Sequence, residues 1–338
     1  THSKVGKPGA SDEERVEINA GVWRYHPQKE VFEVFAEGGS NPWGLDFDDY
    51  GQAFMVGCVI PHLFHVVQGA HYHRQDGEHF NPFVFDDIKT HGDHVHWVGS
   101  YGPHAGNNRS AELGGGHAHA GAMVYLGGSW PEEYRNRIFM NNVHGARTNT
   151  DILEREGSGY VGRHGPDFLV ANDSWSQLIN LRYGPDGSVF LIDWYDKNQC
   201  HSTNPDVHNK TLGRIYRVAY EQDRWVQVDL QKLSSLELVE LQLHENDWYV
   251  RHARRILQER GQGLTGWVAR TGRAEFIRER ALQDPRLWLP DDASEQGAEP
   301  DRQAPAGGHA DPGQPGGGVL AGQPRHGYPG EWQPAGRA

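Results

Sequence analysis

The sequence predicts a mainly β fold, a partial β-propeller followed by a short α-helical segment and a disordered tail. Short alternating apolar runs separated by glycine-rich turns fill residues 20–220, a pattern typical of antiparallel strands. A helical period replaces it over residues 229–260, and glycine, proline, arginine and glutamine dominate residues 261–338. A strand–turn–strand unit also occurs twice, which favours repeated propeller blades over the alternative, a two-sheet sandwich.

The composition narrows the class of protein. A net charge of −13 over 338 residues argues against a nucleic-acid-binding surface. No apolar run approaches the roughly 18 residues of a membrane helix, so we expect no transmembrane segment. The sequence starts at Thr1 with no visible signal peptide, which indicates a removed leader or a fragment. Cys58 and Cys200 lie far apart, and either a disulfide or two thiols fits them.

The propeller region, residues 20–220, follows an N-terminal segment of residues 1–19. Within it, residues 45–56 align without gaps with residues 181–192. Each copy reads as a strand, a tight turn and a second strand, with Gly51 or Gly187 where the turn needs a positive φ. Residues 22–25 resemble residues 215–218 in the same way, as strands with alternate apolar side chains.

Two short helices are predicted after the propeller. Ser234 and Glu237 form a capping-box pattern at the start of the first. Asn246 or Asp247 can cap the second helix. One of its faces is apolar and carries Val250, Ala253 and Leu257. The pair predicts the start of HEAT-like repeats, which either packs on the propeller or has lost its neighbouring repeats. The tail from residue 261 has too few apolar side chains to fold.

Several stretches carry a resemblance to a known family. They are GVWRYHP, NPWGLDFDDYGQAF, CVIPHLFHV, GGGHAHAGAMVYLGGSWPEEYRNRIFMNNVHG, GSGYVGRHGPDFL and LRYGPDGSVFLIDWYDKNQCH. The chain resembles planctomycete-type membrane-bound dehydrogenases of the soluble glucose/sorbosone dehydrogenase-like superfamily. The resemblance implies a six-bladed propeller, then helical repeats and often a c-type cytochrome. The strands are too few for six blades and Cys-x-x-Cys-His is absent, so we expect the C-terminal part of the propeller without a haem attachment site.

The resemblance also implies a function. It points to a fragment of a secreted or periplasmic oxidoreductase, a quinone-dependent dehydrogenase of sugars or other alcohols that passes electrons to a linked c-type cytochrome. Pyrroloquinoline quinone and calcium are the implied cofactors. The alternative is a non-catalytic propeller and HEAT module that binds a glycan or a protein.

Histidine marks the candidate site, with 11 of the 21 histidines between His62 and His119. By resemblance, His117 and His119 lie at the mouth of the propeller cavity, and residues two apart on an extended chain face the same way. His144 is expected to accept a proton, and Arg147 to bind a carboxylate. The alternative for each is a structural hydrogen bond.

A hairpin is expected to bring these residues together. The strand over residues 122–126 should be followed by an antiparallel strand over residues 138–143, with Asn136 in the connection. Because the second strand runs back along the first, it would place His144 at the end of the hairpin where His119 lies. We therefore expect His117, His119 and His144 to share one cavity, with Arg147 nearby.

Two further polar stretches are candidates. Asp193 and Lys197 follow a predicted strand and are expected to contact the cofactor, although Asx turns would explain the same pattern. The segment THGDHVHW holds His91, His94 and His96, which would need a further ligand such as Asp93 to bind a metal. A solvated loop is the interpretation that we prefer for this segment, and no metal is assigned.

Overall fold

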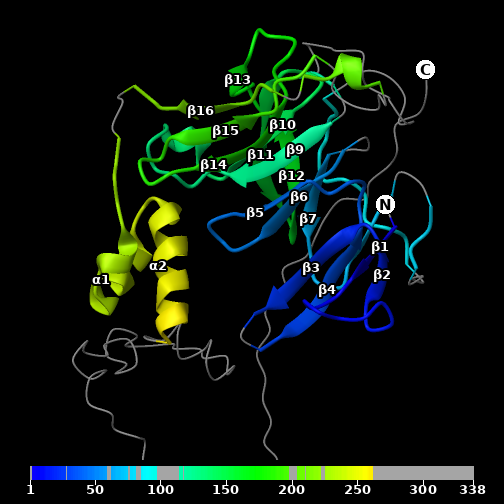
Figure 1. Cartoon of the computed structure of the whole chain (residues 1–338), viewed down its shortest axis with the longest axis horizontal. Coiled ribbons are helices and arrows are strands. Elements are labelled where there is room, and N and C mark those ends of the chain that lie inside the picture. Colours follow the sequence, from blue (N-terminus) through cyan, green and yellow to red (C-terminus); the bar gives the residue numbers. More distant parts are fainter. Residues whose placement is uncertain are drawn as a thin grey trace, which may run out of the picture. The chain divides into compact units, whose positions relative to one another are not determined.

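The computed structural model describes residues 2–27, 29–58, 62–74, 77–80, 85–96, 114–116, 118–197, 204–209, 211–221 and 225–261. Within these ranges the chain forms sixteen β-strands and two α-helices (Figure 1). His117, Cys200 and the tail from residue 262 lie outside them, so the predictions for these residues remain untested.

Small sheets make up the N-terminal part. A two-stranded sheet pairs β1 (His2–Val5) with β2 (Val16–Asn19). The next sheet has the order β3–β4–β8, formed by Gly21–His26, Val31–Gly38 and His71–Tyr72. A third has the order β5–β6–β7, formed by Gly44–Phe47, Ala53–Val56 and Leu63–Val66. All pairs are antiparallel except β4 and β8, which run parallel.

Two further sheets follow. The five-stranded sheet has the order β12–β11–β10–β9, and β13 pairs with β11. Its strands are β9 (His119–Val124), β10 (Arg137–Asn142), β11 (Arg147–Glu156), β12 (Gly159–His164) and β13 (Leu169–Val170). The last sheet has the order β14–β15–β16, formed by Leu178–Tyr183, Val189–Asp193 and Arg214–Val218. Sheets of three or more strands in succession confirm the expected class, mainly β with a partial propeller.

The aligned repeat forms the same structure twice. Residues 45–56 build the β5–β6 hairpin and residues 181–192 build the β14–β15 hairpin. Gly51 and Gly187 adopt φ values of +73° and +75°. A side chain at either position would strain the turn, which explains why both copies carry glycine.

The main hydrophobic core lies between the third sheet, the five-stranded sheet and the last sheet. It includes Phe54 and Leu63 of the third sheet, Met123 and Phe139 of the five-stranded sheet, and Leu191 of the last sheet. All are at most 1% exposed. This core fixes the third sheet against β9 and β10, so residues at the strand ends are held in place.

Two helices follow the sheets, α1 (Ser235–Glu240) and α2 (Asp247–Arg260). Short 3-10 helices also occur: η1 (Glu132–Tyr134), η2 (Pro205–Val207), η3 (Leu230–Lys232) and η4 (Leu241–Leu243). The capping box of Ser234 and Glu237 is present, and Asn246 caps α2. No helix in the described ranges has the length and hydropathy needed to cross a membrane.

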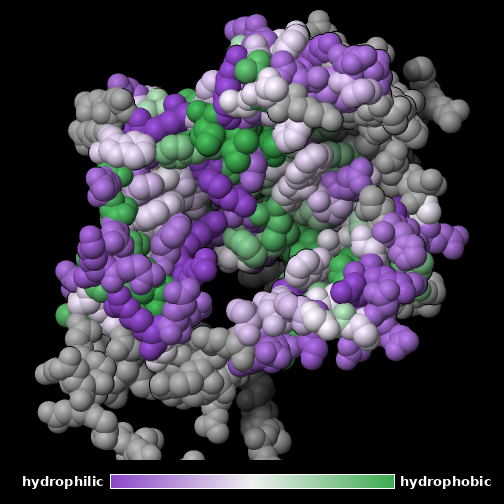
Figure 2. Space-filling view, in the orientation of Figure 1, coloured by the Kyte–Doolittle hydropathy of each residue, from purple (hydrophilic) through white to green (hydrophobic). Residues whose placement is uncertain are grey.

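The helices pack on the sheets. Arg251 of α2 forms an ion pair with Asp46 of β5 at 2.7 Å, and Asn246 Nδ2 donates to the carbonyl of Gly184 at 3.0 Å. The expected packing of the helical segment on the propeller is thus confirmed, although its assignment to HEAT-like repeats stays a prediction. Figure 2 shows hydrophobic surface over β15 and β16 and a largely hydrophilic outer face on α1 and α2.

Candidate metal centre

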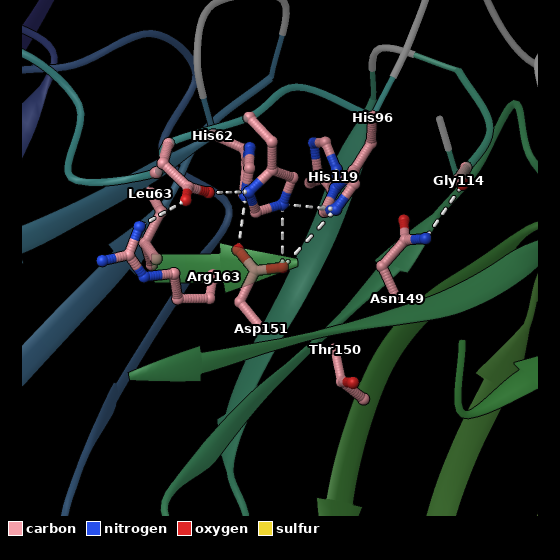
Figure 3. A network of polar contacts seen from close by, with 12 residues as sticks. His62, Leu63, His96, Gly114, His119, Asn149, Thr150, Asp151 and Arg163 are labelled. Atoms are coloured by element: carbon pink, nitrogen blue, oxygen red, sulfur yellow. Dashed lines mark hydrogen bonds and ion pairs between the residues drawn. The ribbon is translucent and has the colours of Figure 1, made fainter. Parts of the chain in front are cut away.

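A group of buried histidines gathers between the third sheet and the five-stranded sheet. His62 directly precedes β7, His119 is the first residue of β9, and Asp151 lies on β11. The segment that carries His94 and His96 crosses between these sheets, since the Gly162 amide of β12 donates to a carbonyl just before it. Figure 3 shows His62, His96 and His119 directed toward one another above Asp151.

The Asp151 carboxylate is the centre of this group. Its Oδ2 lies 2.6 Å from His62 Nε2. Its Oδ1 lies 3.2 Å from His94 Nε2 and 3.4 Å from His96 Nε2. One ligand atom from each of the four residues lies within 4.8 Å of the others. We call His62, His94, His96 and Asp151 the metal centre.

The metal centre is enclosed and its rings are held from outside. The side chains of His62, His96 and Asp151 are 0% exposed, and that of His94 is 17% exposed. His94 Nδ1 lies 2.8 Å from the carboxylate of Asp93, on the side away from Asp151. A carboxylate on the outer nitrogen of a ligating histidine is a common feature of metal sites, because it fixes the tautomer and the ring orientation.

His119 and Arg163 complete the outer contacts. His119 Nε2 lies 2.8 Å from His96 Nδ1, and its ring stacks on His62 with centroids 4.8 Å apart. Arg163 forms an ion pair with the other oxygen of the Asp93 carboxylate, Oδ2, at 2.8 Å. In the metal centre, His94 and His96 therefore each have a partner at Nδ1, the ring nitrogen that points away from Asp151. His62 Nδ1 is buried without a hydrogen-bond partner among the residues described.

Counting protons shows why a cation would suit the centre. If His94 donates its Nδ1 proton to Asp93, a neutral ring presents a lone pair at Nε2. That lone pair faces Asp151 Oδ1, an acceptor, and lies 3.0 Å from His96 Nε2. Either a proton on His94 or a metal ion among these atoms removes the repulsion. The same four atoms thus suit a protonated, metal-free state and a metal-bound state.

The pKa shifts agree with this description. Burial lowers the pKa of His94, but the hydrogen bond to Asp151 and the charges of Asp151 and Asp93 outweigh burial and raise it. Burial, then the neighbouring His62, lowers the pKa of His96 to about 3. Burial opposes ionisation of Asp151, yet the surrounding imidazoles hold its pKa well below the ordinary value. At neutral pH His96 and Asp151 are thus in the protonation states that bind metal.

The solvated-loop interpretation of THGDHVHW is wrong. His96 is fully buried and His94 is mostly buried, because the segment runs between two sheets. The structure also replaces the suggested carboxylate: Asp151 lies at Nε2 of His94, among the other histidines, whereas Asp93 lies at Nδ1, on the outer side of the ring. His91 is set apart, since its Nδ1 accepts from the backbone amide of His65.

The predicted β9–β10 hairpin is confirmed, with His119 paired to Asn142 in register. Asn136 adopts a positive φ in the connection. His144 is buried in the turn after β10, at the end where His119 lies. The His119 ring contacts the rings of His62 and His96, which both belong to the metal centre. A ligand shared with His144 stays a prediction.

Two of the residues expected to hold a quinone are engaged elsewhere, and a third is exposed. Arg147 forms an ion pair with Asp167 at 2.6 Å. The buried Asp193 carboxylate accepts from the amides of Gln177 and Tyr195, as in an Asx turn, and Lys197 is exposed. Pyrroloquinoline quinone needs unpaired cations for its carboxylates, and calcium needs several unengaged oxygen ligands. Arg147 and Asp193 therefore offer these cofactors no unengaged groups in this structure, and binding of pyrroloquinoline quinone and calcium stays a prediction.

Sequence reasoning did not assign His62 and Asp151 to the site. They lie 89 residues apart, and no local spacing links them. The available sequence signal was the density of histidine between residues 62 and 119, whereas the burial of Asp151 in the first half of β11 appears only in the structure. A buried ionisable side chain needs a partner, and for Asp151 the histidines fill this role.

Comparison with solved structures finds distant similarity to sugar dehydrogenases. An oxidoreductase of Thermus thermophilus described as a glucose dehydrogenase shares 16% identity over 55% of this chain and 47% of its own, with a TM-score of 0.35. The soluble aldose sugar dehydrogenase of Escherichia coli, in its apo form, shares 16% over 48% and 44%, with a TM-score of 0.30. The chain spans less than half the length of each.

No curated protein matches the sequence. A family model does match, over residues 1–222, which include every residue of the metal centre. The chain therefore belongs to the family described as domain of unknown function DUF7133.

Proposed function

We propose that this chain is a metal-binding propeller domain in which the metal centre holds one divalent transition-metal ion. The observation that carries the proposal is the convergence of three imidazole nitrogens and one carboxylate oxygen within 4.8 Å, in a buried position. Imidazole suits zinc, copper, iron and nickel. Zinc fits this set best, because four nitrogen, sulfur or oxygen ligands in a closed tetrahedron are its usual structural arrangement.

The proposed ion stabilises the junction between two sheets. Its ligands come from the residue before β7, the segment before residue 97, and β11. With four protein ligands no position is left for a substrate, which favours a structural role over a catalytic one. An ion that binds only the folded chain adds about 2.7 kcal/mol of stability at a free concentration one hundred times its dissociation constant.

Metal analysis tests the proposal. Chelator-treated protein is dialysed against zinc, and bound zinc is measured by mass spectrometry. We expect His96→Ala to lose one equivalent of zinc per chain and most of the thermal stabilisation that zinc gives. The control is His73→Ala, which removes an exposed imidazole. Equal zinc binding by His96→Ala and the unchanged chain would refute the proposal.

A second function is proposed for the whole protein on the basis of the quoted family motifs. It is oxidation of a sugar or another alcohol by a quinone-dependent enzyme, outside the cytoplasm, with electrons passed to a c-type cytochrome. Arg147 and Asp193 have protein partners and add no support for the quinone. Dye reduction by the longer protein, with quinone and calcium added and a sugar panel as substrates, tests this function. No reduction with any sugar leaves the alternative, a binding module for a glycan or a protein.

A further inference from the structure

A second group of metal-ligating side chains lies at the β4–β8 pair, away from the metal centre. Glu37 of β4 and His71 of β8 are partners in the parallel register, so their side chains emerge on the same face of the sheet. His79 reaches the same place from the following segment, and its ring lies 4.6 Å from that of His71. One ligand atom from each residue lies within 4.8 Å of the others.

The spacing fits a shared ion better than a hydrogen bond. His71 Nε2 and Glu37 Oε1 lie 3.8 Å apart, which is too long for a hydrogen bond. Two ligands that each lie about 2.0–2.2 Å from one tetrahedral zinc ion are separated by about 3.3–3.6 Å. A small inward movement of these two side chains would bring them to that separation.

Two buried polar atoms at this place lack a hydrogen-bond partner among the described residues. They are Glu37 Oε2 and His79 Nδ1. The side chains are 14% and 10% exposed, so water reaches them poorly. An unsatisfied buried polar atom costs about 1–3 kcal/mol. Since both atoms are metal ligands by chemistry, a bound cation would satisfy both at once.

The other nitrogen of His79 is already held. Both carboxylate oxygens of Asp87 lie 3.1 Å from His79 Nε2. Asp87 therefore fixes the ring with Nδ1 as its remaining acceptor, the arrangement found around ligating histidines. Gly38 provides the room for this ring, because a Cβ at Gly38 would lie 2.8 Å from His79 Cε1.

We propose that Glu37, His71 and His79 bind a second divalent transition-metal ion, in a site with an open coordination position. Two histidines and one carboxylate form the ligand set of catalytic zinc sites and of non-haem iron sites, in which water or substrate takes the remaining positions. The second site therefore differs in kind from the metal centre, which offers four protein ligands.

Metal stoichiometry tests the second site on the full chain. Chelator-treated protein is dialysed against zinc and the bound zinc is measured. We expect two equivalents for the unchanged chain and one for His79→Ala or Glu37→Gln, with the control His73→Ala still at two. His73 is exposed and lies two residues from His71. Two equivalents in both variants, with circular dichroism unchanged, would overturn the proposal.

A second measurement separates the two sites. Cobalt replaces zinc, and its visible spectrum reports the coordination number. In His96→Ala we expect a spectrum that azide shifts, because azide enters the open position of the second site. In His79→Ala the remaining cobalt should not respond to azide. If His96→Ala loses no metal while His79→Ala does, the metal centre fails and the second site stands. A spectrum in His96→Ala that azide leaves unchanged would contradict the open position.

Discussion

Asp93 never touches the proposed ion, yet its position on the outer nitrogen of His94 should control how well the centre binds. Its Oδ1 lies 2.8 Å from His94 Nδ1, and when Nδ1 donates its proton to this carboxylate, Nε2 is left as the acceptor. Arg163 holds the carboxylate in turn. The orientation of one ligand thus depends on a chain of two surface contacts.

Replacing this carboxylate gives the first prediction. Asp93→Asn should lower zinc affinity by about 10–100-fold, the usual effect of removing an outer partner of a ligating histidine. Competition titration against a chromogenic chelator measures the change. Glu154→Gln is the matched control, because Glu154 also binds Arg163, at 2.9 Å. Equal losses in the two variants would show that Arg163, rather than Asp93, governs binding.

The second prediction concerns pH. In chelator-treated protein, burial lowers the pKa values of His65 and His91 below the ordinary 6.5. The charge of Asp48 partly opposes this shift at His65. The charge of His65 lowers the pKa of His91 further. Protonation therefore favours the unfolded chain. Stability should be full above pH 6.5 and should fall as the pH drops below it. His71 and His96 act in the same direction, and His94, with a raised pKa, opposes them.

Urea unfolding at about pH 7.5 and pH 5.5 measures this effect as a difference in the free energy of unfolding. His65→Gln should show a smaller difference than the unchanged chain, because one titrating group is gone. The exposed His73→Gln should show the same difference as the unchanged chain. A free energy of unfolding that is independent of pH over this interval would contradict the prediction.

At the scale of secondary-structure elements, the two related hairpins share a turn but differ in surroundings. A Cβ at Gly51 would meet nothing within 4 Å. A Cβ at Gly187 would lie 2.4 Å from Ser129 Oγ and 2.6 Å from the carbonyl of Gly127. The same glycine therefore serves backbone conformation in one hairpin, and both conformation and packing in the other.

This difference gives the third prediction. Gly51→Ala should cost about 1–2 kcal/mol, the strain of a positive φ alone. Gly187→Ala should cost more, because a backbone carbonyl cannot move aside as a flexible side chain can. Chemical denaturation of the two variants measures both values, and each serves as the control for the other. Equal losses would mean that the loop containing Gly127 adapts freely.

Elements with a local signal were predictable from the sequence. Glycine positions and alternating apolar residues located both hairpins, and the capping box located α1. The role of Arg251 was not predictable. The helical pattern places it outside, yet it binds Asp46, which lies 205 residues away. A periodic pattern reports which face is apolar and carries no information about which distant residue meets the polar face.

The same limit explains the site. The His-x-His spacing of His94 and His96 was visible, but a loop and a metal site share that spacing. Burial decides between them, and burial depends on sheets that meet only in the folded chain. Asp151 supplies the missing ligand from a strand 57 residues after His94. Local spacing therefore indicated the ligand type, and tertiary structure alone assembled the set.

At the scale of the whole molecule, one sheet leaves apolar side chains in solvent. Ile192, Trp194 and Leu212 are each about half exposed, and Ile215 of β16 is 76% exposed. Within the described part of the chain β16 pairs only with β15. An exposed strand edge beside apolar side chains favours association between copies.

The fourth prediction follows from this edge. The chain should self-associate at high concentration, and Ile215→Lys should shift it toward the monomer without lowering its melting temperature, since the side chain is mostly exposed. Sedimentation velocity over a concentration series measures the shift. Thr211→Lys, an exposed substitution outside the strand, is the control. A monomer at all concentrations for the unchanged chain would contradict the prediction.

The wide separation of the metal ligands along the chain has a consequence for biosynthesis. During translation His62, His94 and His96 leave the ribosome well before Asp151, which is 57 residues beyond His94. N-terminal segments fold first as the chain is made. The histidines can therefore hold a captured ion only loosely until β11 has emerged and paired. Metal uptake should finish as a late step of folding. A nascent chain that is stalled before β11 would therefore still exchange its metal freely.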